Sequence, residues 1–415
     1  MKKVILAVGI ALIWFGGTNL GFSATTQVDA LVEKLVEKGI LNRKEAIQLK
    51  AEIAEDEKIV RQEGLKQDLP SWVNNIKFTG DLRTRYQWEE KDGSEERHRG
   101  RIRLRFGAEM KVNDELKAFT GFASGGSDPR STNQTFQDTF QHPDLRLDYA
   151  YAEYKPKTWL TLDAGKIKGM PFWTPSDYLW DTDINSEGLA AKFGWAVRPN
   201  LNLSLNTGFF VLDESSSDTS DPFMVSLQPG FKWNILESEP EKLSLETAFT
   251  YYIFDNVQGS TLDNSSGTNT LENSKLKYDY DSISLSSELG VKEPFGSEGI
   301  LPYAGIIGEY INNLDPSTDN NGWLIGTKLG YKSVKGKKQW QLRYTYRDLE
   351  KDAWLDTFPD SDFYGGGTGV KGHEILLGYG LLKNVNLELD YYHNKNTFGT
   401  IKEEDLFQFD VNYKF

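Results

Sequence analysis

The feature that most constrains the fold is an alternation of apolar and polar residues with a period of two, which runs from about residue 75 to the end of the chain. In the last such run, Phe407, Phe409 and Val411 alternate with Gln408 and Asp410. Alternation over about ten residues, bounded by turn residues, is typical of a strand with one apolar and one polar face. The sequence contains sixteen such runs: 75–88, 100–112, 116–124, 145–155, 159–166, 188–196, 201–212, 222–233, 242–254, 279–291, 300–311, 322–332, 338–349, 371–381, 384–394 and 405–415.

The connections between the runs alternate in length. Short links such as "NDE", "KPK", "VRPN", "SVKGK" and "KN" separate long ones, including residues 167–187 and the stretch "EKDAWLDTFPDSDFYGGGTGV". Short turns on one side, long loops on the other and an even number of strands are the pattern of a transmembrane barrel. We therefore predict an all-β fold, an antiparallel up-and-down β-barrel of about 16 strands with a short N-terminal α-helical segment.

The alternative fold is a soluble β-sandwich, which shows the same alternation when one face is wet. Tyrosine and tryptophan near the ends of the runs favour the barrel, because aromatic side chains gather at the two membrane interfaces. These are Trp88, Trp159, Trp195, Trp233, Trp323 and Tyr391.

The first residues differ from the rest of the chain. Lys2 and Lys3 precede an apolar stretch and the small residues Ser23 and Ala24, which predicts a secretory signal peptide over residues 1–24. An uncleaved N-terminal anchor is the alternative. The chain has no cysteine, so we expect the exported protein to fold without disulfides. Its net charge of -14 argues against nucleic acid as a partner.

Residues 25–70 have helical spacing, with Val28, Leu31 and Leu35 on one face. Asn42 and Glu45 have the spacing of a capping box, so we predict helices over about 28–38 and 43–63. This periplasmic segment is either a module for oligomerisation or cell-wall contact, or a helical hairpin packed on the inner rim of the barrel. We expect residues 71–415 to form the barrel.

Four segments resemble the putative porins of Gram-negative outer membranes: "LPSWVNNIKFTGDLRTRYQ", "SGGSDPRSTNQTF", "LDYAYAEYKP" and "AGKIKGMPFWTPSDYLWDTDINSEGLAAKF". The resemblance implies a pore in the bacterial outer membrane that passes ions and small hydrophilic solutes and forms a homotrimer. Phe415 is similar to the terminal aromatic residue of many such barrels, which implies recognition by the outer-membrane assembly machinery.

Seven of the 14 arginines lie between residues 83 and 105. Strand parity turns five of them into the lumen on two adjacent strands, where they form one charged surface, the arginine wall: Arg83, Arg85, Arg101, Arg103 and Arg105. Arginine stays charged and binds phosphate or carboxylate groups, so this wall predicts a constriction that favours anions. Arg97 and Arg99 fall near the outer end, where they would guide anions or bind lipopolysaccharide phosphates.

Neighbouring arginines repel one another, so carboxylates are expected opposite them. Loop 167–187 is rich in aromatic residues and carries the acids Asp177, Asp181, Asp183 and Glu187. We predict that this loop folds into the lumen and that its acids oppose the arginine wall at a narrow waist. In the alternative arrangement the loop lies on the rim, and the arginines pair with inward Asp81, Glu109 or Asp148.

No cofactor, metal site or catalytic site is predicted. The sequence from Asp181 has the first spacings of a calcium loop, but it lacks the glycine and the final glutamate of that motif. His142 beside "DPRSTNQ" is the one open enzymatic alternative, a barrel hydrolase. Besides a diffusion porin, the sequence is compatible with a channel selective for phosphate or acidic organic solutes, and with a structural protein that links the outer membrane to the cell wall.

Overall fold

The computed structural model describes residues 34, 36–38, 42–47, 49, 75–214, 216, 220–236, 239, 242–296 and 301–415. The chain divides into one unit of residues 1–74 and a second of residues 75–415. The predicted signal peptide, and most of the predicted helical segment 25–70, lie outside the described residues. No helix among the described residues is long and apolar enough to cross a membrane.

The described part of the first unit is helical at residues 43–47. Asn42 N–H donates to Glu45 Oε2 over 2.8 Å, and Glu45 N–H donates to Asn42 Oδ1 over 2.9 Å. These two bonds confirm the predicted capping box, which satisfies backbone donors that the first helical turn leaves free.

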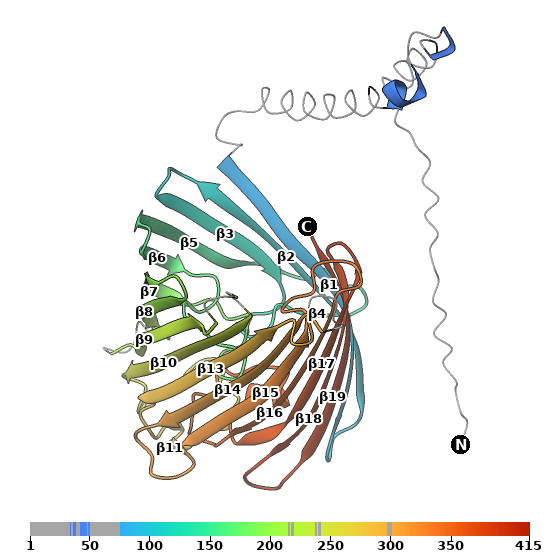
Figure 1. The fold of residues 1–415 in the computed structure, drawn as a ribbon. Coiled ribbons are helices and arrows are strands. Elements are labelled where there is room, and N and C mark those ends of the chain that lie inside the picture. Colours follow the sequence, from blue (N-terminus) through green and yellow to red (C-terminus); the bar gives the residue numbers. More distant parts are fainter. Residues whose placement is uncertain are drawn as a thin grey trace, which may run out of the picture. The chain divides into compact units, whose positions relative to one another are not determined.

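The second unit is a closed antiparallel barrel of sixteen strands (Figure 1). The strands are β1 (Ile76–Lys91), β2 (Arg97–Lys111), β3 (Leu116–Ser124), β5 (Leu145–Lys157), β6 (Leu160–Lys166), β7 (Glu187–Arg198), β8 (Leu201–Val211), β9 (Phe223–Asn234), β10 (Leu243–Asp255), β13 (Ser282–Lys292), β14 (Tyr303–Asn313), β15 (Asn321–Gly330), β16 (Trp340–Leu349), β17 (Val370–Leu382), β18 (Val385–Asn396) and β19 (Glu403–Lys414). Each pairs with its neighbour in sequence, and β19 pairs with β1 to close the barrel. The predicted fold class and strand number are confirmed.

Three two-residue strands lie in the connections and were not predicted. They are β4 (Gln134–Thr135), which pairs with β2, and the hairpin β11 (Leu271–Glu272) with β12 (Lys275–Leu276). Strands this short leave no periodic signal in a sequence. They indicate that the long connections have ordered structure of their own.

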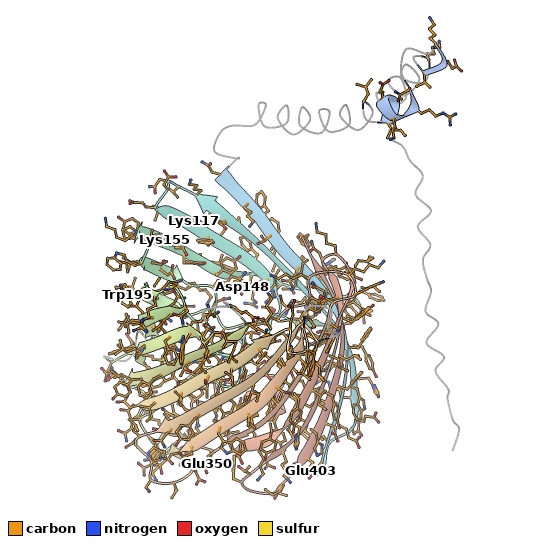
Figure 2. All side chains as sticks on the ribbon, viewed as in Figure 1. Lys117, Asp148, Lys155, Trp195, Glu350 and Glu403 are labelled. Atoms are coloured by element: carbon orange, nitrogen blue, oxygen red, sulfur yellow. The ribbon has the colours of Figure 1, made fainter. Side chains whose placement is uncertain are left out.

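The outer and inner faces of the barrel follow the predicted strand parity. Phe78, Tyr86 and Phe106 are exposed on the outer surface, whereas Arg83 and Arg85, which alternate with them, are buried inside. Trp195 also projects from the outer surface, as Figure 2 shows at the left edge of the barrel. The apolar positions therefore face lipid and the polar positions face the lumen, as expected for a barrel that encloses water.

The seam between the first and last strands is closed by Phe415. Its backbone N–H donates to Gly80 O over 3.0 Å, and Gly80 N–H donates to Phe415 O over 2.8 Å. The ring of Phe415 occupies the space that a side chain at position 80 would need. Glycine at position 80 thus lets the terminal aromatic ring cover the joint between β1 and β19.

Candidate functional site: a charged passage inside the barrel

All five residues of the arginine wall face the lumen on β1 and β2. The strand register places Arg83 directly opposite Arg103 and Arg85 directly opposite Arg101. Like charges directly opposite each other on a sheet are destabilising. The stability of this wall therefore depends on the carboxylates around it.

The first of these carboxylates comes from the last strand. Asp410 of β19 lies opposite Arg85 and accepts two hydrogen bonds from it, Nε to Oδ1 over 2.7 Å and Nη2 to Oδ2 over 2.8 Å. Its Oδ2 also lies 3.4 Å from Arg83 Nη1. Two parallel bonds between an arginine and a carboxylate fix the geometry of both groups. The closure of the barrel thus supplies the main counter-charge of β1.

The second carboxylate lies within the wall itself. Asp81 of β1 accepts from Arg103 Nη2 over 2.8 Å and from Arg105 Nε over 2.9 Å. Asp81 was one of three acids proposed for this role if the loop lay on the rim. The other two acids have partners outside the arginine wall. Glu109 accepts a hydrogen bond from Lys117, and Asp148 accepts one from Asn185.

Loop 167–186, which connects β6 to β7, supplies the third carboxylate. Asp183 Oδ1 lies 3.0 Å from Arg105 Nη1, and Asp183 Oδ2 accepts from the backbone N–H and the hydroxyl of Thr132. Burial by itself favours the neutral acid, but Arg103 and Arg105 outweigh it and hold the pKa of Asp183 below its usual value. Asp183 therefore carries a negative charge against the arginine wall.

The other three acids predicted from this loop have different partners. Asp181 accepts from the backbone N–H of Ser361 over 2.8 Å. Asp177 lies 3.6 Å from Arg343 Nη2 and 3.8 Å from Arg347 Nη1, on β16. Glu187 is the first residue of β7 and pairs with Lys166. Of the four predicted acids, the structure brings Asp183 alone into contact with the predicted arginines.

A second loop, residues 350–369 between β16 and β17, also contributes acids. Asp362 Oδ2 lies 2.9 Å from Arg85 Nη1, and Asp360 Oδ2 lies 2.7 Å from Arg347 Nη2. Although burial opposes ionisation, Arg85 lowers the pKa of Asp362 to about 2. Burial, with the nearby charge of Asp177, raises the pKa of Asp360 to about 7.

Sequence reasoning missed this second loop. Its segment "DAWLDTFPDSDFY" combines aromatic residues with acids, the same composition that singled out loop 167–187. Applied a second time, that criterion identifies Asp360 and Asp362.

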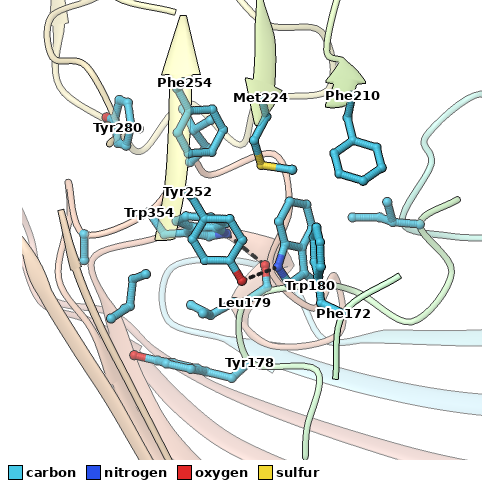
Figure 3. Packing of buried hydrophobic residues seen from close by; sticks show 14 of the residues in the cluster. Phe172, Tyr178, Leu179, Trp180, Phe210, Met224, Tyr252, Phe254, Tyr280 and Trp354 are labelled. Carbon is cyan, nitrogen blue, oxygen red and sulfur yellow. Dashed lines mark hydrogen bonds between the residues drawn. The ribbon is translucent and has the colours of Figure 1, made fainter. Parts of the chain in front are cut away.

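The two loops are held by an apolar cluster on one side of the lumen (Figure 3). Trp354 and Trp180 meet edge to face at 5.3 Å, and the Trp354 indole N–H donates to the carbonyl oxygen of Leu179 over 2.9 Å. Tyr252 and Met224, which point inward from β10 and β9, pack against them. This cluster fills the inner face of the middle strands and leaves the charged groups on the side of β1, β2 and β16–β19.

Arg130 joins further loops to this assembly. Its guanidinium donates to the carbonyl oxygens of Asp356 and Gly366 in loop 350–369 and to that of Asn264 in the connection between β10 and β13. The side chain is 6% exposed, so these bonds are shielded from water. Charged hydrogen bonds of this kind each contribute about 1.5–3 kcal/mol, which makes Arg130 a tie between three connections.

Between the loops and the wall lies a charged cavity of about 210 Å³. Its lining includes five arginines and seven carboxylic acids: Arg83, Arg85, Arg103, Arg130, Arg343, Asp177, Asp181, Asp183, Asp360, Asp362, Glu388 and Asp390. In the strand order, Glu388 and Asp390 of β18 thus lie between the arginines of β1 and β2 and Arg343 of β16. The lumen here carries neighbouring regions of both signs.

A closed barrel of sixteen strands, with lipid-facing apolar positions and a charged passage narrowed by loops, has the architecture of a bacterial outer-membrane porin channel. The sequence model of the putative porin family matches residues 88–286 and 277–415. The chain therefore belongs to the putative porin family, as the sequence resemblance implied. This family and this fold are those of channel proteins of the outer membrane.

Solved structures that are similar to this chain include three bacterial proteins. OprB of Pseudomonas putida is 12% identical, with a TM-score of 0.53 over 83% of this chain and 95% of its own. Salmonella typhi OmpF is 13% identical, with a TM-score of 0.47 over 82% of this chain and 97% of its own. Pseudomonas aeruginosa OpdL is 15% identical, with a TM-score of 0.45 over 82% and 99%. At 12% identity, the likeness to OprB shows the fold alone. A search of curated proteins gave no match.

Proposed function

We propose that the protein is a diffusion porin for ions and small hydrophilic solutes, and that its narrowest part is the charged cavity. The observation that carries this proposal is the bond between Asp183 and Arg105, since it fixes loop 167–186 against the arginine wall. Rings of charge at a constriction set the ion preference of a channel. The arginine wall and the acids of both loops are therefore the proposed selectivity residues.

Anion preference follows from the arginine wall only to the extent that its charges are not neutralised. Four of its five arginines lie within 4.0 Å of a carboxylate. Among the described residues, Arg101 has no carboxylate within that distance and donates instead to Gln87 and Ser131. We propose a weak anion preference that depends on Arg101 and increases when the acids of the loops are protonated.

Planar-bilayer recordings test this proposal against the two competing functions. Under a KCl gradient, a diffusion porin of this kind should give discrete channels. Their reversal potential should be small and have the sign of a preference for anions over cations. A channel selective for phosphate or acidic organic solutes gives a much larger preference when phosphate replaces chloride. A structural protein that links membrane and cell wall gives no conductance.

We also propose a periplasmic location for residues 25–70 after removal of the signal peptide 1–24. Both termini of a barrel with an even number of strands lie on the same side, and short turns mark that side as periplasmic. N-terminal sequencing of protein isolated from outer membranes should begin at Thr25. Protease added to intact cells should leave residues 25–70 uncut.

A homotrimer is the proposed assembly, and one face of the barrel supports it. Outward positions on β3, β5 and β6 carry the small residues Ala118, Ala152 and Ala164, which are cross-strand neighbours. Strand β6 has 7 residues, whereas a transmembrane strand needs about 9–11. A second copy of the protein would cover this part of the barrel, where strand β6 is short. Light scattering in detergent should give three copies, and Ala152→Trp should reduce that number.

Lipid, lipopolysaccharide and the assembly machinery remain proposed partners. Arg97 is exposed at the outer end of β2, which suits an outer-leaflet phosphate, whereas Arg99 pairs with Glu89. The ring of Phe415 is partly accessible at the closing seam, where an assembly factor could recognise it. Deletion of Phe415 should lower the amount of folded barrel in the outer membrane.

A further inference from the structure

Two carboxylates of the charged cavity have no cationic partner. Glu388 and Asp390 both face inward from β18, and within the described residues no lysine or arginine nitrogen lies within 4.0 Å of either. Asp183, Asp362 and Asp410 in the same region each have an arginine within that distance. The β18 pair therefore differs from the other acids, because neither carboxyl group is paired with a basic side chain.

A buried amide beside this pair also has no partner. Gln408 of β19 lies directly opposite Asp390 and is 1% exposed, and neither its Oε1 nor its Nε2 makes a hydrogen bond. Asp390 is 8% exposed; its Oδ2 accepts from the Tyr392 hydroxyl over 3.0 Å, while its Oδ1 is unpartnered. An unpaired buried polar group costs about 1–3 kcal/mol. Unused acceptors on two adjacent strands thus indicate a site for a hydrogen-bond donor.

Donor groups of the opposite charge border the same cavity. Arg83 Nη2 donates to Asn133 Oδ1 over 2.6 Å, its Nη1 lies 3.4 Å from Asp410 Oδ2, and its Nε has no hydrogen-bond partner. Arg83 lies directly opposite Arg103, whose Nε and Nη2 donate to Asp81, and both arginines line the cavity. Their guanidinium groups can bind a carboxylate in two-point fashion. One end of the cavity therefore suits an ammonium group and the other a carboxylate.

We propose that the charged cavity is a binding site for small amphoteric solutes, with their ammonium group at Glu388 and Asp390 and their carboxylate at Arg83 and Arg103. This inference rests on the proposed diffusion function and names the solute class that the channel favours. A solute that carries both charges satisfies both ends, whereas one that carries a single charge leaves the other end unpaired. A site rejects a solute more strongly when that solute leaves buried polar groups of the site unpaired than when it differs only in size.

The test uses three probes of equal chain length: 4-aminobutyrate, butyrate and butylammonium. Each is added at neutral pH to single channels recorded in KCl, and the concentration that halves the open-channel current is measured. We expect 4-aminobutyrate to act at a concentration about tenfold lower than either singly charged probe, which corresponds to about 1.4 kcal/mol. Equal potency of the three probes would overturn the proposal.

Isosteric variants separate the two ends of the site. Glu388→Gln with Asp390→Asn should weaken the effect of 4-aminobutyrate about tenfold and that of butylammonium to a similar degree, and leave that of butyrate unchanged. Glu115→Gln is the matched control, since this exposed acid lies in the turn between β2 and β3. Unaltered block by 4-aminobutyrate in the double variant would contradict the assignment.

Two outcomes distinguish this inference from the function on which it rests. Absence of conductance in the wild-type protein would contradict the proposed porin function itself. Normal conductance without preference for the amphoteric probe would contradict the solute class alone. Competition by calcium ions as strong as that by butylammonium would show a site for inorganic cations, and would overturn the assignment to ammonium groups.

Discussion

Asp183 of loop 167–186 and Arg105 of β2 are joined by an ion pair of 3.0 Å, although 78 residues separate them in the sequence. The second oxygen of Asp183 accepts two bonds from Thr132, so the carboxylate also holds the connection between β3 and β5. One side chain thus couples the position of an inner loop to the charge of the wall. Substitutions in this ion pair, or in the packing that supports the loop, should therefore alter both stability and conductance.

Replacing Asp183 with asparagine should release loop 167–186 from the wall. The lost charged hydrogen bond is worth about 1.5–3 kcal/mol, and Arg105 would keep only Asp81 as a partner. We expect a lower thermal unfolding temperature in detergent and larger current fluctuations in single-channel records. Asp114→Asn, which removes a fully exposed partner of Lys111, is the control and should change neither.

The pairing of Arg85 predicts a larger effect on stability. Its side chain is 4% exposed and binds Asp410 and Asp362 together, so Arg85→Gln removes the arginine partner of Asp362 and leaves buried Asp410 with Arg83 alone, at 3.4 Å. Breaking a buried pair from one side typically costs about 3–5 kcal/mol. Urea unfolding of the refolded barrel should show a loss of this size. Adding Asp410→Asn should recover part of it, and no recovery would contradict the pairing.

Ion preference should change with pH near neutrality. Burial and Asp177 raise the pKa of Asp360 to about 7, and burial also raises the pKa of Asp181 above its usual range. Acids with raised pKa values become neutral as the pH falls through those values, so acidification removes negative charge from the cavity. The reversal potential in a KCl gradient should therefore shift toward anions below about pH 7.

Asp360→Asn tests the assignment of that change. Above about pH 7 the variant should prefer anions more than the wild-type protein does, and its pH-dependent shift should be smaller because Asp181 alone of the two acids remains. An unchanged pH profile would assign the titration to another group.

The apolar cluster predicts how strongly the inner loops are held. Trp354 is fully buried among Trp180, Tyr252 and Phe254, and Trp354→Ala leaves a large cavity there. Such a change typically costs about 3–5 kcal/mol. We expect lower stability together with higher and noisier conductance, because both loops lose their support. Higher conductance without any loss of stability would contradict this account of the packing.

Strand parity was sufficient to place the arginine wall. Period two fixes which side chains share a face, and Arg83, Arg85, Arg101, Arg103 and Arg105 all point inward as predicted. Predicted runs in which apolar and polar residues alternate poorly also form strands: 116–124 is β3, and 300–311 corresponds to β14 at residues 303–313. Pairing with neighbours on both sides stabilises a strand whose own alternation is poor.

The partners of the arginines were harder to predict, because they depend on contacts between distant segments. Parity placed Asp410 on the inner face, but only the register between β1 and β19 sets it opposite Arg85. Asp362 reaches the arginine wall, and Asp360 reaches Arg347 of β16, because Trp354 anchors their loop in the apolar cluster. Local patterns in a sequence carry no information about such register and packing.

The central claim is tested most directly by single-channel recording of a variant in which Arg83, Arg85, Arg101, Arg103 and Arg105 are changed to glutamine. Asp410→Asn and Asp362→Asn are added to reduce the number of carboxylates left without an arginine. If the arginine wall forms the narrow part of the pore, conductance should change and the reversal potential in a KCl gradient should move toward cations. Conductance and reversal potential identical to those of the wild-type protein would contradict the claim.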